Sequence, residues 1–286
     1  MRAWAVLGAV AGIGVTACTL LVDTSNLHGS GDGPAQSSDG GSESTSPGAD
    51  ASADGDPVKP ADADADAAAF SCTALGTAPL FCDDFDTSAL QSKWSKVDAD
   101  GYTLAFDTTK FVSAPRSVQL AIDFDGGTAM ASQFLAKTFA QSYSELTIAF
   151  DVMIDTGTYL FHPIQVQGLV DGADVKSDIG LLLEDGKCTL QDEAFDYSQS
   201  KTVAYSSPQF PVTSGIGQWH HFEITIKVTQ PASATIKEDG AEVFTTALHA
   251  YWRSLPPTIG FGHYFVTGAA AATSVHLDNV VVYGKP

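Results

Sequence analysis

The stretch "ELTIAFDVMID", residues 145–155, alternates apolar and polar side chains along most of its length. Every second position is apolar, which is the period of a β-strand buried on one face. The positions that share this face are Leu146, Ile148, Phe150, Val152 and Ile154. The stretches "SVQLAIDF" at 117–124 and "WHHFEITIKV" at 219–228 alternate in the same way. These patterns predict sheets that are packed on one face.

Two Asp-Gly pairs separate further strand-like stretches. "LLLEDGKCTL" turns at Asp185-Gly186 and "TIKEDGAEVF" turns at Asp239-Gly240. Asp-Gly supplies the positive φ angles that a tight hairpin turn requires. No long stripe with the helical period occurs. We therefore expect an all-β fold of about twelve to fourteen strands, arranged as a two-sheet antiparallel β-sandwich.

Residues 1–17 have the pattern of an export signal. Arg2 is the only charged residue before an apolar run from Ala3 to Val15, which is too short to span a bilayer as a helix. Val15-Thr16-Ala17-Cys18 resembles the cleavage end of a bacterial lipoprotein signal peptide. The resemblance implies lipidation of Cys18, and Thr19 after it favours the outer membrane, on its periplasmic or cell-surface face. The alternative is an ordinary secretory signal with an incidental cysteine.

Residues 18–69 differ from the rest of the chain in composition. From Asp23 to Ala69 they contain ten acidic residues, one lysine and no aromatic residue. Such a segment cannot bury enough apolar area to offset the entropy lost on ordering. We expect a disordered acidic linker that separates a membrane anchor from a folded domain.

Residues 70–286 are rich in Val, Ile, Phe, Tyr and Thr and are long enough for one core. The chain carries a net charge of −20, and about −12 remains on this segment without Arg2 and the linker. A field of that sign repels nucleic acid and anionic polymers. We therefore expect no nucleic-acid partner, whereas a neutral polysaccharide or bound Ca²⁺ is compatible with this charge.

Three cysteines remain in the predicted domain. Cys72 and Cys82 are close in sequence and could pair outside the cytoplasm. Closing this loop would contribute about 3 kcal/mol of stability. Cys188 is then a buried apolar thiol in a strand, and its pairing with Cys72 or Cys82 is the alternative.

Several stretches together resemble the concanavalin A-like lectin/glucanase jelly roll, in its bacterial laminin-G-like branch. They are "LFCDDFD" at 80–86, Trp94, "APRSVQLAI" at 114–122, "ELTIAFDVMI" at 145–154, "GQWHHFEITIKV" at 217–228 and "HLDNVVVYG" at 276–284. The resemblance covers most of Phe81 to Gly284. It implies a sandwich whose curved inner sheet has a groove for extended sugars. Members include lectins, carbohydrate-binding modules, glycosidases and polysaccharide lyases, so the fold alone does not decide between binding and cleavage.

No catalytic residue is assigned from the sequence. The family's glucanases have acids two residues apart along one strand, whereas Asp192 and Glu193 are adjacent. "FHPIQVQG" at 161–168 resembles the Gln-Ile-His strand of alginate lyases, but Gln167 stands where the histidine would be. An enzyme is therefore the less favoured interpretation and, if present, one that degrades polysaccharide.

The favoured function is a membrane-anchored, surface-displayed, lectin-like domain that binds carbohydrate without catalysis. Gln165 and Gln167 lie two residues apart on one strand face and can bond sugar hydroxyls. Tyr159, Trp252 and His263 are candidate platforms for sugar rings. The alternatives are a non-catalytic adhesion or protein-binding laminin-G-like domain, and a glycoside hydrolase or polysaccharide lyase.

Calcium is the metal that the sequence favours. Related sandwiches share a structural Ca²⁺ between their first and last strands, and Asp84 and Asp278 are the expected ligands here. Asp83, Asp86 and Asn279 lie close to them in sequence. Zinc is not expected, because His220 and His221 point to opposite faces of a strand. His220 is expected to be a hydrogen-bonded core histidine.

Overall fold

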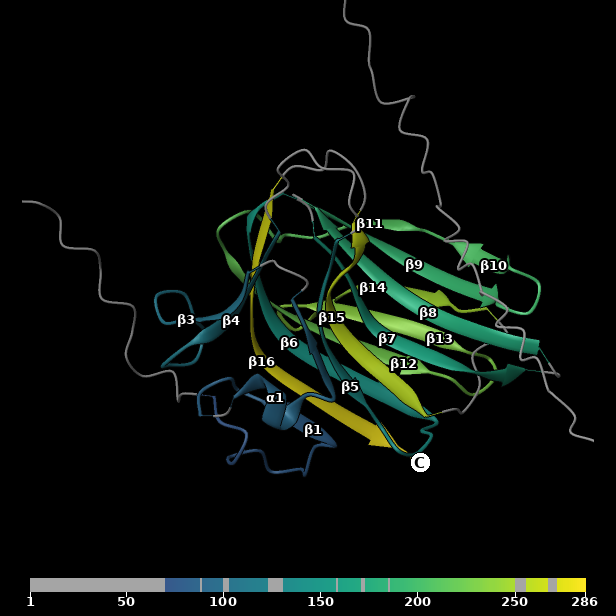
Figure 1. The fold of residues 1–286 in the computed structure, drawn as a ribbon, viewed down its shortest axis with the longest axis horizontal. Helices are drawn as coiled ribbons and strands as arrows, with labels where there is room; N and C mark the ends of the chain where they lie inside the picture. The colour runs from purple at the N-terminus through teal and green to yellow at the C-terminus, as the bar shows by residue number, and fades with distance from the viewer. Residues whose placement is uncertain are drawn as a thin grey trace, which may run out of the picture. The chain divides into compact units, whose positions relative to one another are not determined.

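Two antiparallel sheets of eight strands each form the fold of this computed structural model (Figure 1). The description covers residues 70–87, 89–99, 103–122, 131–157, 159–170, 173–184, 186–249, 256–266 and 272–286. Within these ranges, side chains are described except at 131–132, 159–170, 173–174, 184 and 263–266. The predicted signal peptide, the lipidation of Cys18 and the predicted linker lie outside the described residues, and so does Asp185 of one predicted turn.

Sheet A contains β6 and β12, the strands whose alternation is clearest in the sequence. In spatial order its strands are β14 (Ala241–Ala247), β13 (Ser233–Glu238), β12 (Trp219–Lys227), β6 (Glu145–Thr156), β16 (Thr273–Lys285), β4 (Ser117–Ile122) and β3 (Thr103–Asp107), with β1 (Phe81–Asp83) also paired to β16.

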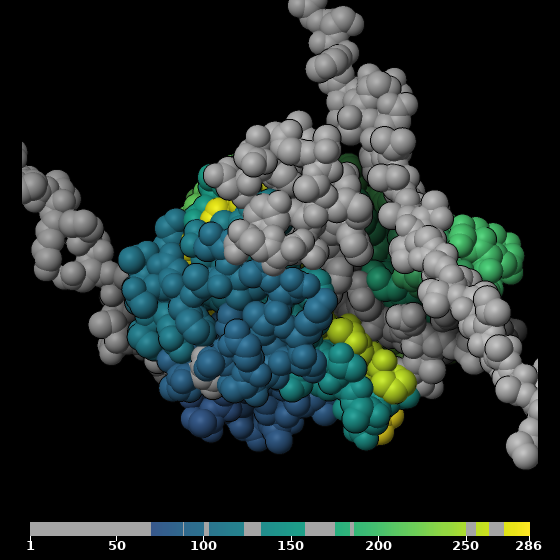
Figure 2. Space-filling view, viewed as in Figure 1, coloured from purple at the N-terminus to yellow at the C-terminus, as the bar shows by residue number. Residues whose placement is uncertain are grey.

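Sheet B faces sheet A. In spatial order its strands are β10 (Lys201–Ser206), β9 (Lys187–Asp196), β8 (Ala173–Glu184), β7 (Tyr159–Val170), β15 (Pro257–Val266), β5 (Ala131–Thr138) and β2 (Lys96–Asp98), with β11 (Gln209–Pro211) also paired to β9. The edge strand β10 lies on the opposite side of the domain from β3 and β4 (Figure 1, Figure 2). One short helix, α1 (Leu90–Lys93), precedes β2.

Aromatic side chains from both sheets meet in the core. Phe150 on β6 and Phe222 on β12 are cross-strand partners, fully buried, with ring centroids 5.9 Å apart. Phe150 also packs edge-to-face against Phe261 of β15 in sheet B, with centroids 5.1 Å apart. Aromatic pairs of this kind add to the stabilisation from burying apolar area. The core therefore joins the two sheets directly.

The predicted all-β, two-sheet antiparallel sandwich is confirmed. The expected number of strands was too low, because the described residues form sixteen. Three of these, β1, β2 and β11, have only three residues each. Three residues are too few to show an alternating pattern in the sequence. Such a strand is recognised only by its pairing with a neighbouring strand. Among the described residues no helix has the length and apolarity needed to cross a membrane.

A buried histidine joins β16 to β3 and β6. His276 is fully buried, with Nε2 2.7 Å from Oδ2 of Asp107 and Nδ1 3.2 Å from Oδ2 of Asp155. Side-chain and backbone hydrogen bonds from Thr109, together with His276, lower the pKa of Asp107 to about 2. The ionised form of Asp107 therefore stabilises the fold above the ordinary carboxyl pKa, and this stabilisation is lost as the pH falls towards 2.

The variant Asp107→Asn tests this contact. We expect it to lower the free energy of unfolding by about 2 kcal/mol at neutral pH, because a hydrogen bond to a charged group is removed. The difference from wild type should shrink as the pH falls from 4 to 2, because Asp107 takes up a proton in the unfolded chain over this range and the stabilisation by its ionised form is lost. Urea unfolding across this range measures both effects. The matched control is Glu223→Gln at the partly exposed ion pair with Lys237, with an expected change below about 1 kcal/mol. A constant difference at all pH values would contradict the assignment.

Candidate functional site

The outer face of sheet B is defined by the side chains that its strands bury. Ile179 and Leu181 on β8 and Leu190 on β9 are fully buried in the core. Because side chains alternate along a strand, the intervening residues of β8 and β9 lie on the face turned away from the core. Asp178 and Glu193 are two of these residues.

Strand pairing places polar residues in one row across this outer face, which we call the sheet B row. Each member is the cross-strand partner of the next, over five neighbouring strands. From β15 to β10 the row consists of Thr258, Gln165, Asp178, Glu193 and Tyr205. A second row beside it consists of Gln167, Lys176, Phe195 and Thr202. The sheet therefore brings the consecutive strands β7 to β10 and the later strand β15 into one band.

Described side chains of the two rows contact one another. Lys176 Nζ lies 3.2 Å from Asp178 Oδ2, and the hydroxyl of Thr202 donates to Oε1 of Glu193 at 3.2 Å. The Tyr205 side chain at the edge is half exposed, at 52%. The band thus combines two carboxylates, an ammonium group and an accessible phenol.

Asp178 and Glu193 form a cross-strand carboxylate pair. Directly opposed residues on antiparallel strands have Cβ atoms about 4.5–5.5 Å apart. Retaining glycosidases hold their two carboxyl groups about 5–5.5 Å apart. Sequence reasoning missed this pair because it searched along single strands. Counting outward from the Asp185-Gly186 turn, which the sequence does reveal, pairs Asp178 with Glu193.

The five predicted sugar ligands divide by position. Gln165 and Gln167 occupy the two polar rows, opposite Asp178 and Lys176. Tyr159 pairs with Leu183, and His263 pairs with Gln133. Both partners, Leu183 and Gln133, are fully buried. Because cross-strand partners lie on the same face of a sheet, positions 159 and 263 are not part of the rows on the outer face. The side chains of all four predicted ligands on β7 and β15 lie outside the described part, as does the whole of Trp252.

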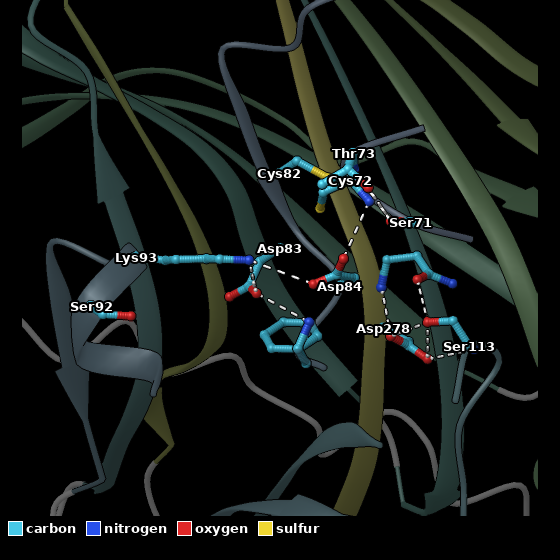
Figure 3. A network of polar contacts seen from close by, with 12 residues as sticks. Ser71, Cys72, Thr73, Cys82, Asp83, Asp84, Ser92, Lys93, Ser113 and Asp278 are labelled. Carbon is cyan, nitrogen blue, oxygen red and sulfur yellow. Dashed lines mark hydrogen bonds and ion pairs between the residues drawn. A yellow bond between two sulfur atoms is a disulfide. The ribbon is translucent and has the colours of Figure 1, made fainter. Parts of the chain in front are cut away.

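Of the two predicted calcium ligands, Asp84 follows the first strand β1 and Asp278 lies on the last strand β16, and Figure 3 draws both in one view. Asp83 accepts hydrogen bonds from Trp94 Nε1 at 2.7 Å and Lys93 Nζ at 2.9 Å. Asp84 Oδ2 accepts one from the backbone N–H of Cys72 at 3.2 Å. A disulfide joins Cys72 to Cys82 beside this group. Cys188, by contrast, is buried in the core opposite Leu183.

Asp278 accepts hydrogen bonds from the backbone of a neighbouring loop (Figure 3). The N–H groups of Val112 and Ser113 donate to its Oδ2 at 2.9 and 3.0 Å, and that of Asn279 donates to Oδ1 at 2.9 Å. Burial outweighs these donors and raises the pKa of Asp278 to about 7. Both oxygens of Asp278 thus accept hydrogen bonds from the protein, and a calcium ion here would have to replace some of these.

The calcium expectation stays a prediction that a titration tests. If Asp84 and Asp278 hold Ca²⁺, millimolar Ca²⁺ should raise the melting temperature of the chelator-treated protein, because a ligand that binds only the folded state stabilises it. The shift should vanish in Asp278→Ala. An unchanged melting temperature in wild type would contradict the expectation.

Comparison with known proteins identifies relatives by fold alone. No protein-family model and no curated protein matches the chain. Its fold is similar to that of an endo-β-1,4-glucuronan lyase from the fungus Trichoderma reesei, with a TM-score of 0.56 and 14% identity, covering 73% of this chain and 96% of that one. Weaker similarity links it to the cellulose-induced protein Cip1 (TM-score 0.46, 16% identity, 71% and 96% covered) and to the family-7 alginate lyase A1-II′ (0.45, 16%, 65% and 86%). The domain is therefore a concanavalin A-like β-sandwich of the jelly-roll type.

The prediction of a lectin-like domain without catalysis needs correction. It rested on the predicted anchor and linker, on the fold resemblance and on the lack of catalytic pairs along single strands, whereas Asp178 and Glu193 are partners across two strands. The glucuronan lyase, 96% of which is covered by this fold, is a polysaccharide lyase. The comparisons thus favour the alternative of a polysaccharide-degrading enzyme over the main prediction.

Proposed function

We propose that residues 70–286 form a polysaccharide-degrading enzyme that acts at the sheet B row, with cleavage by a lyase as the first candidate reaction. The supporting observation is the fold shared with the glucuronan lyase over 96% of that chain. The row adds a band of polar positions across five strands, whose length suits an extended sugar chain. The partner we propose is accordingly a polysaccharide.

A lyase requires three functions close together. A base removes the proton beside the sugar carboxylate, a positive or donor group stabilises the charge that develops there, and an acid protonates the leaving oxygen. In the two rows, Lys176 supplies positive charge and Tyr205 supplies an exposed hydroxyl for proton transfer. Gln165 and Gln167 occupy positions from which amides can bind the substrate.

Hydrolysis is the second candidate, and the Asp178–Glu193 pair favours it. One carboxyl group would act as nucleophile and the other as acid, which is the arrangement of a retaining glycosidase. The negative charge of the domain also favours a neutral polysaccharide over an anionic one.

Product analysis separates the two reactions. The full-length protein is incubated with neutral polysaccharides and with uronate polymers. A lyase leaves a carbon–carbon double bond, which absorbs ultraviolet light, whereas a hydrolase yields reducing ends without this absorbance. We expect one of these products from at least one polymer. No product from any polymer would contradict the proposed function.

Substitutions in the row identify the reacting groups. If hydrolysis occurs, Asp178→Asn and Glu193→Gln should each lower kcat by about 100-fold or more, because each removes a carboxyl group that reacts. If elimination occurs, Tyr205→Phe should have the comparable effect. Glu223→Gln on the outer face of sheet A is the matched control and should leave kcat unchanged. Equal activity in all four variants would show that the reaction centre lies elsewhere.

We also propose, from the sequence alone, that lipidated Cys18 anchors the enzyme in the outer membrane and that residues 18–69 tether it. Several acyl chains would give firm anchoring, where a single chain would be marginal. Mass spectrometry of the mature protein tests this proposal. A first residue Cys18 with acyl chains is expected, and an unmodified thiol would contradict it.

A further inference from the structure

A histidine and two carboxylates meet on sheet A, the sheet that does not contain the sheet B row. His220 is the second residue of β12, Glu238 ends β13, and Asp239 begins the turn to β14. One ligand atom from each residue lies within 4.8 Å of the other two. His220 and Glu238 are buried, at 9% and 3% exposure, and Asp239 is exposed.

The carboxylates are oriented so that one oxygen of each faces the imidazole. Glu238 Oε2 accepts the backbone N–H of Thr213 at 2.7 Å, and Asp239 Oδ1 accepts that of His221 at 2.9 Å. The other two oxygens lie near Nδ1 of His220, with Asp239 Oδ2 at 2.9 Å and Glu238 Oε1 at 3.5 Å. Backbone donors thus fix the carboxylates while three possible ligand atoms converge.

Glu238 Oε1 is a buried acceptor with no hydrogen-bond partner among the described residues. A buried carboxylate oxygen without a partner is costly and rare in folded proteins. His220 Nε2 also has no partner there, so the described polar contacts of the ring are those of Nδ1 with the two carboxylates. A cation between Nδ1 and Oε1 would satisfy the buried oxygen.

We propose that His220 Nδ1, Glu238 Oε1 and Asp239 Oδ2 bind one divalent transition-metal ion, of which Zn²⁺ is the representative. Zinc takes histidine nitrogen and carboxylate oxygen at about 2.0–2.2 Å, so its tetrahedral ligands lie roughly 3.3–3.5 Å apart. The Nδ1 to Oε1 separation of 3.5 Å already has this value, whereas the exposed Asp239 Oδ2, 2.9 Å from Nδ1, would have to move outward. Three protein ligands leave the fourth position to water. Calcium is the wrong class of ion, because it selects oxygen ligands.

The ion would join β12 to the end of β13 and the turn that follows it. The loop before β12 is attached to the same group, because the N–H of Thr213 donates to Glu238. Its expected effect is therefore on the stability of sheet A. Sequence reasoning excluded zinc because it looked for a second ligand on the same strand as His220, and both other ligands come from the neighbouring strand and its turn.

His221 provides a matched control. Its ring lies 2.7 Å from Asp151, and it contacts Asp239 only through its backbone N–H, which His221→Ala preserves. His221→Ala should therefore keep the ion, while His220→Ala should lose it. Asp239→Asn adds an exposed variant of nearly the same shape, which is expected to fold.

The test is calorimetric titration of the chelator-treated, full-length protein with zinc chloride, with calcium chloride as the comparison. We expect one zinc per chain, a raised melting temperature, and no binding of calcium to these residues. Affinity for zinc should fall at least tenfold in Asp239→Asn and be retained in His221→Ala. Absence of zinc binding, or equal zinc binding in wild type, His220→Ala and Asp239→Asn, would overturn the proposal.

Discussion

The contact of Phe150 with Phe222 and Phe261 is the constraint on which the rest of the structure depends. It requires β6 and β12 to present one face to the core and β15 of the opposite sheet to meet them. Because side chains alternate with period two, a slip of one residue in any of these strands would turn its apolar set to solvent. The core thereby fixes which residues of each strand can face outward.

The candidate site follows from this constraint. With Ile179 and Leu190 held in the core, Asp178 and Glu193 must lie on the outer face of sheet B, and the antiparallel register sets them opposite each other. The same register brings Gln165 and Tyr205 to either side. The sheet thus assembles this chemistry from four consecutive strands, β7 to β10. Different residues at the same positions would support different reactions on one jelly roll.

The sequence predicts the sandwich because the alternation of apolar and polar residues is visible within a single strand, and the apolar face of each strand is the one that packs in the core. The Asp178–Glu193 pair could also have been found in the sequence, because the Asp185-Gly186 dipeptide predicts a tight turn from which the register of β8 and β9 can be counted. The grouping of His220 with Glu238 and Asp239 depends on the orientation of carboxylates by Thr213 and His221, which no local pattern shows. The short strands β2 and β11 show no pattern in the sequence for a related reason, because only their pairing partners define them.

A crystal structure of the full-length protein with an oligosaccharide bound tests the central claim most directly. The account predicts sugar rings lying across β7, β8, β9 and β10, with hydroxyl groups within hydrogen-bond distance of Asp178 and Glu193. Sugar bound on the outer face of sheet A, or on sheet B away from these two carboxylates, would contradict it.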